Sequence, residues 1–227
     1  MSSLAERLLE TRAQITQECT RLSRAEPTLI VVTKNHPMSL AQELYELGER
    51  DFGENRVQEA LPKFIEFNQG QSRPEVNWHL IGQLQTNKVK QALEFASSLH
   101  SLDRQSLLDE LIKRTNERTI PLEVFLQVNL TQDSNRGGVT GESLMSFAAQ
   151  VAEVASLKLA GLMAVASLDG EPSRDFELVA KLSEQLTAEH PAANQLSIGM
   201  SGDFVEALSF GATHLRIGTA ITGNRSI

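Results

Sequence analysis

Cysteine is nearly absent from this sequence of 227 residues, and the single one excludes an intrachain disulfide. That scarcity is typical of proteins from a reducing compartment. Cys19 lies within a helical pattern and has no nearby histidine partner. We therefore interpret it as a small buried apolar residue rather than a reactive thiol.

Long hydrophobic runs are also missing. No apolar stretch approaches the roughly 20 residues of a membrane span, and residues 1–7 become charged too soon for a signal peptide. Acidic residues outnumber basic ones by 29 to 21, which gives a net charge of -8 and argues against binding to nucleic acid or anionic membranes. We expect a cytoplasmic protein whose acidic surface still leaves room for a local basic pocket.

Several motif classes are absent as well. Because no His-x-His or His-x-x-x-His spacing occurs, we predict no metal site and interpret His79, His100 and His214 as core residues. The sequence has no Gly-x-Ser-x-Gly elbow, and no Gly-x-Gly-x-x-Gly follows its first expected strand. It contains no internal repeat, low-complexity tract or linker, which predicts a single domain over 1–227.

The apolar pattern predicts strands that alternate with helices. The first segment is an amphipathic helix, which Ser3 and Glu6 open as a capping box and Pro27 ends. An apolar, β-branched run follows at 29–33, as in strands that are buried on both faces. Further strands are expected at 51–54, 77–81, 98–102, 122–129, 157–165, 195–198 and 214–217.

Helices are expected between these strands. Ser39 is predicted to open one of them, Asn55 to cap the next, and Pro62 to disturb it. Eight βα units in a chain of this length predict an α/β fold, a single closed (β/α)₈ barrel with an extra N-terminal helix. An open Rossmann-like sheet is the alternative. The remaining helices are expected at 86–95, 104–117, 143–155, 171–190 and 203–210.

Lys34 stands where function lies in such barrels, directly after the first strand. We expect its stem in the core and its nitrogen at the barrel mouth, where desolvation favours the neutral amine that attacks an aldehyde. An ordinary lysine that reaches into solvent is the alternative.

Glycine-containing turns follow the seventh and eighth expected strands. Barrels often bind phosphate at these loops, because backbone N–H groups and nearby hydroxyls converge on an anion there. The first turn, 199–203, contains Ser201, and the second places Thr219 beside Gly218. Ordinary turns are the alternative, but together with Lys34 they predict a barrel that holds a phosphorylated aldehyde.

Arg216 precedes Gly218 by two residues on the last expected strand, so alternation directs its side chain into the barrel. A guanidinium there donates to a ring nitrogen and keeps a pyridine nitrogen unprotonated. A salt bridge to a strand-end carboxylate such as Glu54 is the alternative. Asn55 is either a helix cap or a ligand contact at the rim.

Seven segments, in order along nearly the whole chain, resemble the pyridoxal phosphate homeostasis proteins, which are similar to the barrel domain of alanine racemase. The longest are WHLIGQLQTNK at 78–88 and GATHLRIGT at 211–219. The others are VVTK at 31–34, FGENRVQE at 52–59, HSLD at 100–103, GLM at 161–163 and SIGMSGDF at 197–204.

The resemblance implies pyridoxal 5′-phosphate (PLP) as cofactor, held as a Schiff base on Lys34. It also implies that Ser201, Gly218 and Thr219 contact the phosphate, and that Arg216 faces the pyridine nitrogen. Two further residues resemble cofactor-wall positions, Asn55 and Met200.

Four segments depart from the family pattern near the rim. Asn35-His36 follows the lysine where many members have Thr-Lys, and Leu80 stands where an aromatic residue is commoner. Arg136 replaces a frequent lysine, and 164–166 replaces a Thr-Ile-Pro-like turn. We expect these departures to affect rim contacts and any partner surface rather than the Schiff base.

Family members are thought to bind and deliver PLP without established catalysis, so the resemblance implies an intracellular PLP carrier with apo-enzymes as recipients. A PLP-dependent racemase or lyase of low activity is the alternative. Racemisation needs acid–base groups on both faces of the adduct, and the only tyrosine, Tyr45, is expected to serve packing. A Schiff-base aldolase without bound PLP is a third class. Lacking the second racemase domain, the chain is expected to be a monomer.

Overall fold

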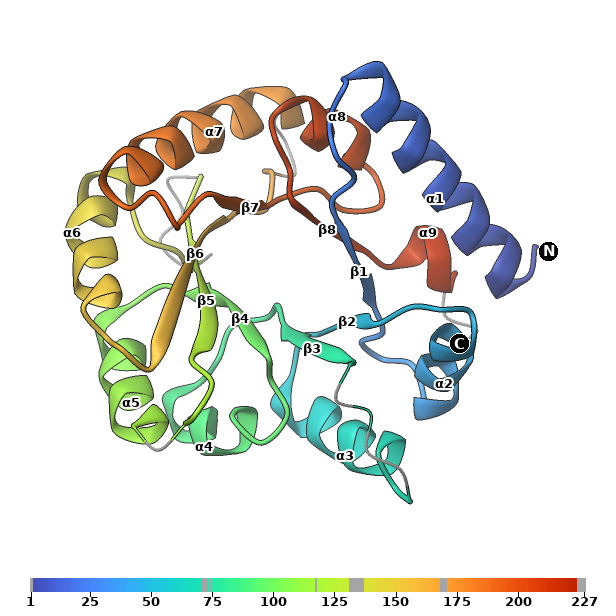
Figure 1. The fold of residues 1–227 in the computed structure, drawn as a ribbon, viewed down its shortest axis with the longest axis horizontal. Coiled ribbons are helices and arrows are strands. Elements are labelled where there is room, and N and C mark those ends of the chain that lie inside the picture. The colour runs from blue at the N-terminus through green and yellow to red at the C-terminus, as the bar shows by residue number, and fades with distance from the viewer. Residues whose placement is uncertain are drawn as a thin grey trace.

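The structure is a computed structural model that describes residues 2–70, 73, 75–116, 118–130, 137–167 and 171–223. At its centre lies a closed barrel of parallel strands in the order β1 to β8 (Figure 1). This closure confirms the predicted (β/α)₈ barrel and rules out the open Rossmann-like sheet. The strands are β1 Thr28–Val32, β2 Asp51–Glu54, β3 Asn77–Leu80, β4 Ser98–Leu102, β5 Leu122–Gln127, β6 Leu157–Met163, β7 Gln195–Ser197 and β8 His214–Ile217.

Helices form a layer around the barrel, and the predicted extra helix α1 lies outside β1 and beside α9 (Figure 1). A short 3-10 turn, η1, precedes α4. The helices are α1 Leu4–Arg21, α2 Met38–Glu46, α3 Val57–Phe67, η1 Thr86–Lys88, α4 Val89–Ala92, α5 Gln105–Thr115, α6 Gly141–Ala152, α7 Pro172–Glu189, α8 Phe204–Ser209 and α9 Thr219–Thr222. No helix of the described residues is long and apolar enough to cross a membrane.

Helix α1 follows the sequence prediction closely. The Ser3 hydroxyl accepts from the Glu6 N–H while the Glu6 carboxylate accepts from the Ser3 N–H, so the capping box is present. Leu8, Ile15 and Cys19 lie on the buried face, because residues three or four apart share one side of a helix. Cys19 is thus the buried small residue that its position predicted.

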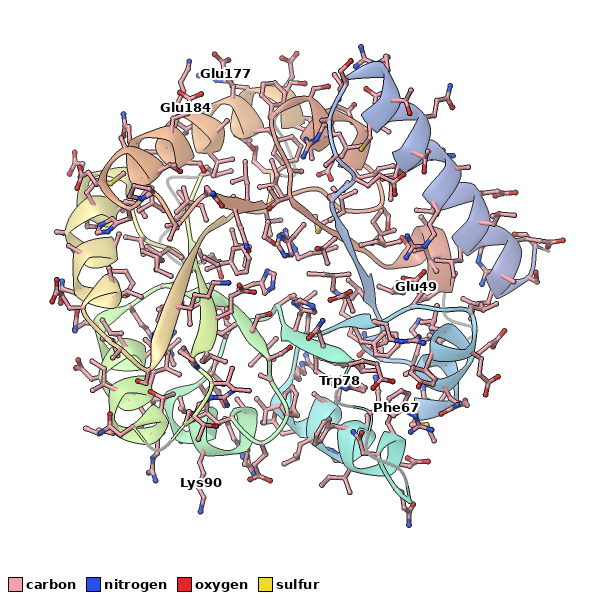
Figure 2. All side chains as sticks on the ribbon, viewed as in Figure 1. Glu49, Phe67, Trp78, Lys90, Glu177 and Glu184 are labelled. Atoms are coloured by element: carbon pink, nitrogen blue, oxygen red, sulfur yellow. The ribbon has the colours of Figure 1, made fainter. Side chains whose placement is uncertain are left out.

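Between α3 and the barrel lies a cluster of aromatic rings. Trp78 packs edge-on against Phe52 and Phe67, with ring centroids 5.4 and 5.6 Å away. Figure 2 shows Trp78 and Phe67 inside the molecule, in contrast to the outward-pointing Lys90. This layer fixes α3 on the outer face of β2 and β3, and so positions the loops at their ends.

The structure corrects several predicted helix boundaries. Helix α2 begins at Met38 after Pro37, and α3 begins after Arg56, so neither Ser39 nor Asn55 is the capping residue. Helix α3 runs through Pro62 without ending. The helix expected at 86–95 shrinks to η1 and the four residues of α4, and α9 was not foreseen.

We predict that Gly161→Ala lowers the free energy of unfolding by about 3 kcal/mol, because an overpacked core must shift its backbone. A Cβ at Gly161 would lie 1.8 Å from the carbonyl oxygen of Gln195 on the neighbouring strand β7. Urea unfolding measures the change. The control is Gly202→Ala, whose added Cβ meets nothing within 4 Å; an equal loss in both variants would contradict the packing argument.

Candidate functional site

The carboxyl ends of the first and last strands meet at one mouth of the barrel. In the β1–β8 ladder Val31 pairs with Ile217, so the residues that follow each strand are neighbours. Lys34 comes two residues after β1, and Gly218 directly follows β8. A Cβ on Gly218 would lie 3.5 Å from the Cβ of Val32. Barrel closure therefore brings the predicted lysine and phosphate loops together.

Lys34 lies in a tight turn. The His36 N–H donates to the Thr33 carbonyl over 3.1 Å, and Asn35 takes a left-handed conformation with φ 63°. Asparagine adopts this region more easily than most residues, so the departure at Asn35 suits the turn. The side chain of Lys34 is exposed. The expectation that its stem is buried in the core is therefore wrong, because the turn directs the residue to the rim.

A second lysine beside this turn is buried instead. Lys63 of α3 forms an ion pair with Glu54 and donates to the Thr33 carbonyl over 2.9 Å. The Thr33 hydroxyl donates to the same Glu54 carboxylate over 2.7 Å. Sequence reasoning missed this group, although Lys63 stands at helical spacing between the buried residues Ala60 and Phe67. These contacts of Lys63 and Glu54 hold Thr33, the residue directly before Lys34, in place.

The loops after β7 and β8, where a phosphate site is predicted, contain a hydroxyl that accepts from two backbone N–H groups. Ser201 Oγ accepts from the N–H groups of Gly218 and Ala220, over 3.2 and 3.3 Å. Thr219 lies between these two residues and is exposed, as is Met200 in the facing loop. The structure thus brings Ser201, Gly218 and Thr219 together, as the sequence predicted.

Gly199 is required for packing beneath the loop. Its φ is 90°, and a Cβ there would lie 2.7 Å from the Ala207 Cβ and 2.9 Å from Leu215 Cδ2. Asp203 does not cap α8 with its side chain; Oδ1 accepts from the Met200 N–H instead.

Arg216 reaches into the barrel and is buried. Nη1 donates to the Ser197 carbonyl and hydroxyl over 2.6 and 2.7 Å, and Nη2 donates to the Ala164 carbonyl over 2.9 Å. The alternative of a salt bridge to Glu54 is wrong, because Glu54 pairs with Lys63. Burial lowers the pKa of Arg216 to about 10, with Asp203 opposing the shift, so the guanidinium stays charged at neutral pH.

The unusual segment after β6 does not disturb Arg216. Its contact there is the backbone carbonyl of Ala164, which is independent of the side chain at that position. Leu80, a second departure, is buried in the core. The third, Arg136, lies outside the described residues.

Asn55 lies at the same mouth, between β2 and β3. A Cβ on Gly82 would lie 2.3 Å from the Asn55 carbonyl oxygen, so this backbone crosses closely over the β3 loop. Asn55 lines a pocket of about 520 Å³ together with Arg56, Gln83 and Lys88. It is therefore a rim residue rather than a helix cap.

Comparison with known proteins agrees with this geometry. Residues 10–226 match the family model described as alanine racemase, N-terminal domain. The chain is 36% identical to the pyridoxal phosphate homeostasis protein of Escherichia coli, over 99% of this chain and 98% of that one. It belongs to this family. The family protein of Aquifex aeolicus is also 36% identical, over 97% of both chains.

Solved structures give the same fold. PipY of Synechococcus elongatus, solved with PLP bound, has a TM-score of 0.84 and 33% identity, covering 97% of this chain and 100% of that one. Alanine racemase of Corynebacterium glutamicum has a TM-score of 0.71 at 13% identity, covering 98% of this chain and 60% of the racemase. The second likeness concerns the fold alone.

We predict that Lys63→Met costs about 3–5 kcal/mol of stability, because it leaves the Glu54 carboxylate buried without its cation. The Glu54 side chain has no exposed area, and its Oε2 already lacks a hydrogen-bond partner among the described residues. Adding Glu54→Gln should recover most of the loss, since an amide oxygen still accepts from Thr33. Urea unfolding of both variants checks this; no recovery in the double variant would contradict the ion-pair explanation.

Proposed function

We propose that this chain binds PLP as a Schiff base on Lys34 and serves in PLP homeostasis. The observation that carries the proposal is the β1–β8 ladder, which places the Lys34 turn beside Gly218. Ser201, Gly218 and Thr219 bind the phosphate, and Arg216 faces the ring nitrogen. Asn55 and Met200 form the wall. The full-length identity to homeostasis proteins and the PLP-bound PipY structure support this assignment.

The residues present fit the chemistry of the cofactor. A phosphate needs several donors around one point, and Ser201 already gathers two backbone N–H groups there. A pyridine nitrogen accepts a hydrogen bond, and Arg216 offers only donors. Bound PLP supplies an aldehyde that takes up amines and a ring that withdraws electrons.

Lys34 is a lysine at this mouth that is available to an aldehyde. Its side chain is exposed and forms no ion pair with any residue that the structure describes. Lys63 pairs with Glu54 and donates to the Thr33 carbonyl, and its buried side chain is not accessible to an aldehyde. The rim position of Lys34 also suits a carrier, because a recipient enzyme can approach the bond that holds the cofactor.

The position of Tyr45 favours a carrier over a racemase. Its hydroxyl donates to Glu75, and its ring stacks on Arg50 at 4.1 Å. Both partners precede strand starts, so Tyr45 lies towards the face opposite Lys34. No other tyrosine exists in the sequence to serve the second face of an adduct. A weak racemase or lyase activity is the alternative.

Borohydride reduction of the protein with PLP should leave a pyridoxyl-phosphate group on Lys34, detected by peptide mass spectrometry. Reduction traps the bond that a free amine forms with an aldehyde. Lys34→Ala should abolish this adduct, whereas Lys88→Ala at the neighbouring pocket should retain it. An adduct on another lysine, or none at all, would overturn the proposed Schiff base.

Racemisation assays separate the carrier from the enzyme. With PLP bound, we expect no conversion of L-alanine to D-alanine above that of the Lys34→Ala variant. Conversion that depends on Lys34 would establish the racemase alternative. A yellow purified protein would argue against the aldolase class, which needs no PLP.

The monomeric state and the cytoplasmic location stay predictions. Sedimentation velocity at working concentration should give a single species of about 25.0 kDa, the mass of one chain. A stable dimer would contradict this expectation.

A further inference from the structure

Beneath the proposed cofactor site, the barrel interior contains several buried polar side chains. His79 of β3 and His100 of β4 are buried there, with serines beside them at Ser98 and Ser197. The His100 ring stacks on Phe125 with centroids 4.3 Å apart. No group of three or more metal-binding side chains occurs among the described residues. The proposed function leaves this cluster without a role.

These side chains form one continuous hydrogen-bond chain from Arg216 to Asp51. Arg216 Nη1 lies 2.7 Å from Ser197 Oγ, which lies 2.9 Å from His100 Nδ1. The other ring nitrogen, Nε2, lies 3.1 Å from Ser98 Oγ. Ser98 Oγ is 2.7 Å from His79 Nδ1, and His79 Nε2 is 3.0 Å from Asp51 Oδ1.

The two ends fix the positions of the hydrogens on the two histidine rings. A guanidinium only donates and a carboxylate only accepts. Asp51 therefore requires the hydrogen of neutral His79 on Nε2, which leaves Nδ1 as an acceptor. Ser98 or His100 Nε2, which is 3.2 Å away, must then donate to that nitrogen. In either case His100 carries its hydrogen on Nε2 and accepts from Ser197 at Nδ1.

The surroundings keep the His100 ring neutral. Burial first, and then the neighbouring His79, Arg216 and His214, hold the pKa of His100 well below its usual range. Burial would raise the pKa of Asp51, but the hydrogen bonds from His79 and Asn77, together with the nearby imidazole rings, lower it overall. The chain thus has a cation at one end, an anion at the other and the neutral His100 ring between them.

The Asp51 end opens on the opposite face of the barrel. Asp51, His79 and Ser98 line a pocket of about 370 Å³ formed by residues at the strand starts. The charged pair of Lys158 and Glu123, 2.9 Å apart, lines the same pocket. His214 completes it, with a pKa lowered to about 4 by burial first and then by the charge of His79.

We propose that Ser197, His100 and the His79–Asp51 pair are positioning residues that hold Arg216 towards the cofactor from beneath, and that they connect the cofactor to the pocket on the far face. This inference rests on the proposed function, since it takes the cofactor to be the group that Arg216 faces. A solute at the far pocket that changes the His79 tautomer changes which nitrogen of His100 carries hydrogen, and that change passes along the chain to Arg216.

The first test needs no cofactor. Nitrogen-15 NMR of the histidine rings distinguishes a protonated ring nitrogen from one that accepts. In the PLP-free protein at neutral pH, His79 and His100 should both carry hydrogen on Nε2 and a lone pair on Nδ1. A His100 ring protonated on Nδ1 would overturn the chain, whatever the protein does with PLP.

The second test uses Ser197→Ala, which removes the link between His100 and Arg216 but leaves the backbone contact of Arg216. The PLP dissociation constant from visible absorbance should rise about tenfold, as for the loss of one hydrogen bond to a charged group. The control is Thr115→Val, which removes a buried hydroxyl in α5 that contacts the Leu111 carbonyl and Ser156. Equal PLP affinity in both variants and the wild type would overturn the positioning role.

If Ser197→Ala does not fold, Asp51→Asn provides a second test. Asp51 is partly exposed, so the protein should tolerate this substitution. Removing the carboxylate should produce a mixture of His79 tautomers and weaken PLP binding by a smaller factor. An unchanged His79 spectrum would contradict the chain. If the wild type itself takes up no PLP while both rings show the expected tautomers, the proposed function fails and the hydrogen-bond chain stands.

Discussion

The pairing of β8 with β1 is the constraint on which the rest of the structure depends. It joins the two ends of the sequence, so Lys34 and Gly218, 184 positions apart, belong to adjoining strands. It also places Arg216 on β8, two residues before Gly218, with its side chain in the barrel interior. Without closure, Lys34 and the proposed phosphate loops would lie on opposite edges of an open sheet.

The closed barrel imposes a second condition, because side chains must fill its interior. Much of this interior is polar, with histidines and serines where barrels commonly place branched apolar residues. Buried polar groups are tolerated when each has a partner, and the chain from Arg216 to Asp51 supplies those partners. The same network that satisfies the core therefore fixes the guanidinium that faces the proposed cofactor.

The fold followed from the sequence because the strongest signals were local. Runs such as 29–33 and the helical stripe of α1 report burial directly, and the order of the elements fixes the barrel. Helix starts were predicted less well. Ser39 and Asn55 have capping side chains, but Pro37 and Arg56 occupy the cap positions instead. The helix after β3 was overestimated because an apolar pattern does not show where a helix turns into a 3-10 segment.

The site residues were predictable as positions but not as environments. Barrel closure confirms that Lys34, Ser201 and Gly218 share one mouth. Lys34 is nevertheless exposed, because it lies in the turn with Asn35, and the strand pattern does not predict that turn. The Glu54–Lys63 pair was missed since charged residues are ordinarily exposed. The signal that could have revealed this pair was the position of Lys63 within an apolar helical stripe. The hydrogen-bond chain depends on contacts between five strands, which sequence spacing does not report.

The most direct test of the account is a crystal structure of the protein soaked with PLP. The account predicts continuous density between Lys34 Nζ and the cofactor, with the phosphate at Ser201, Gly218 and Thr219. The ring nitrogen should face Arg216, whose Nη1 stays bonded to Ser197. Density that joins a different lysine, or a phosphate bound away from the β7 and β8 loops, would contradict it.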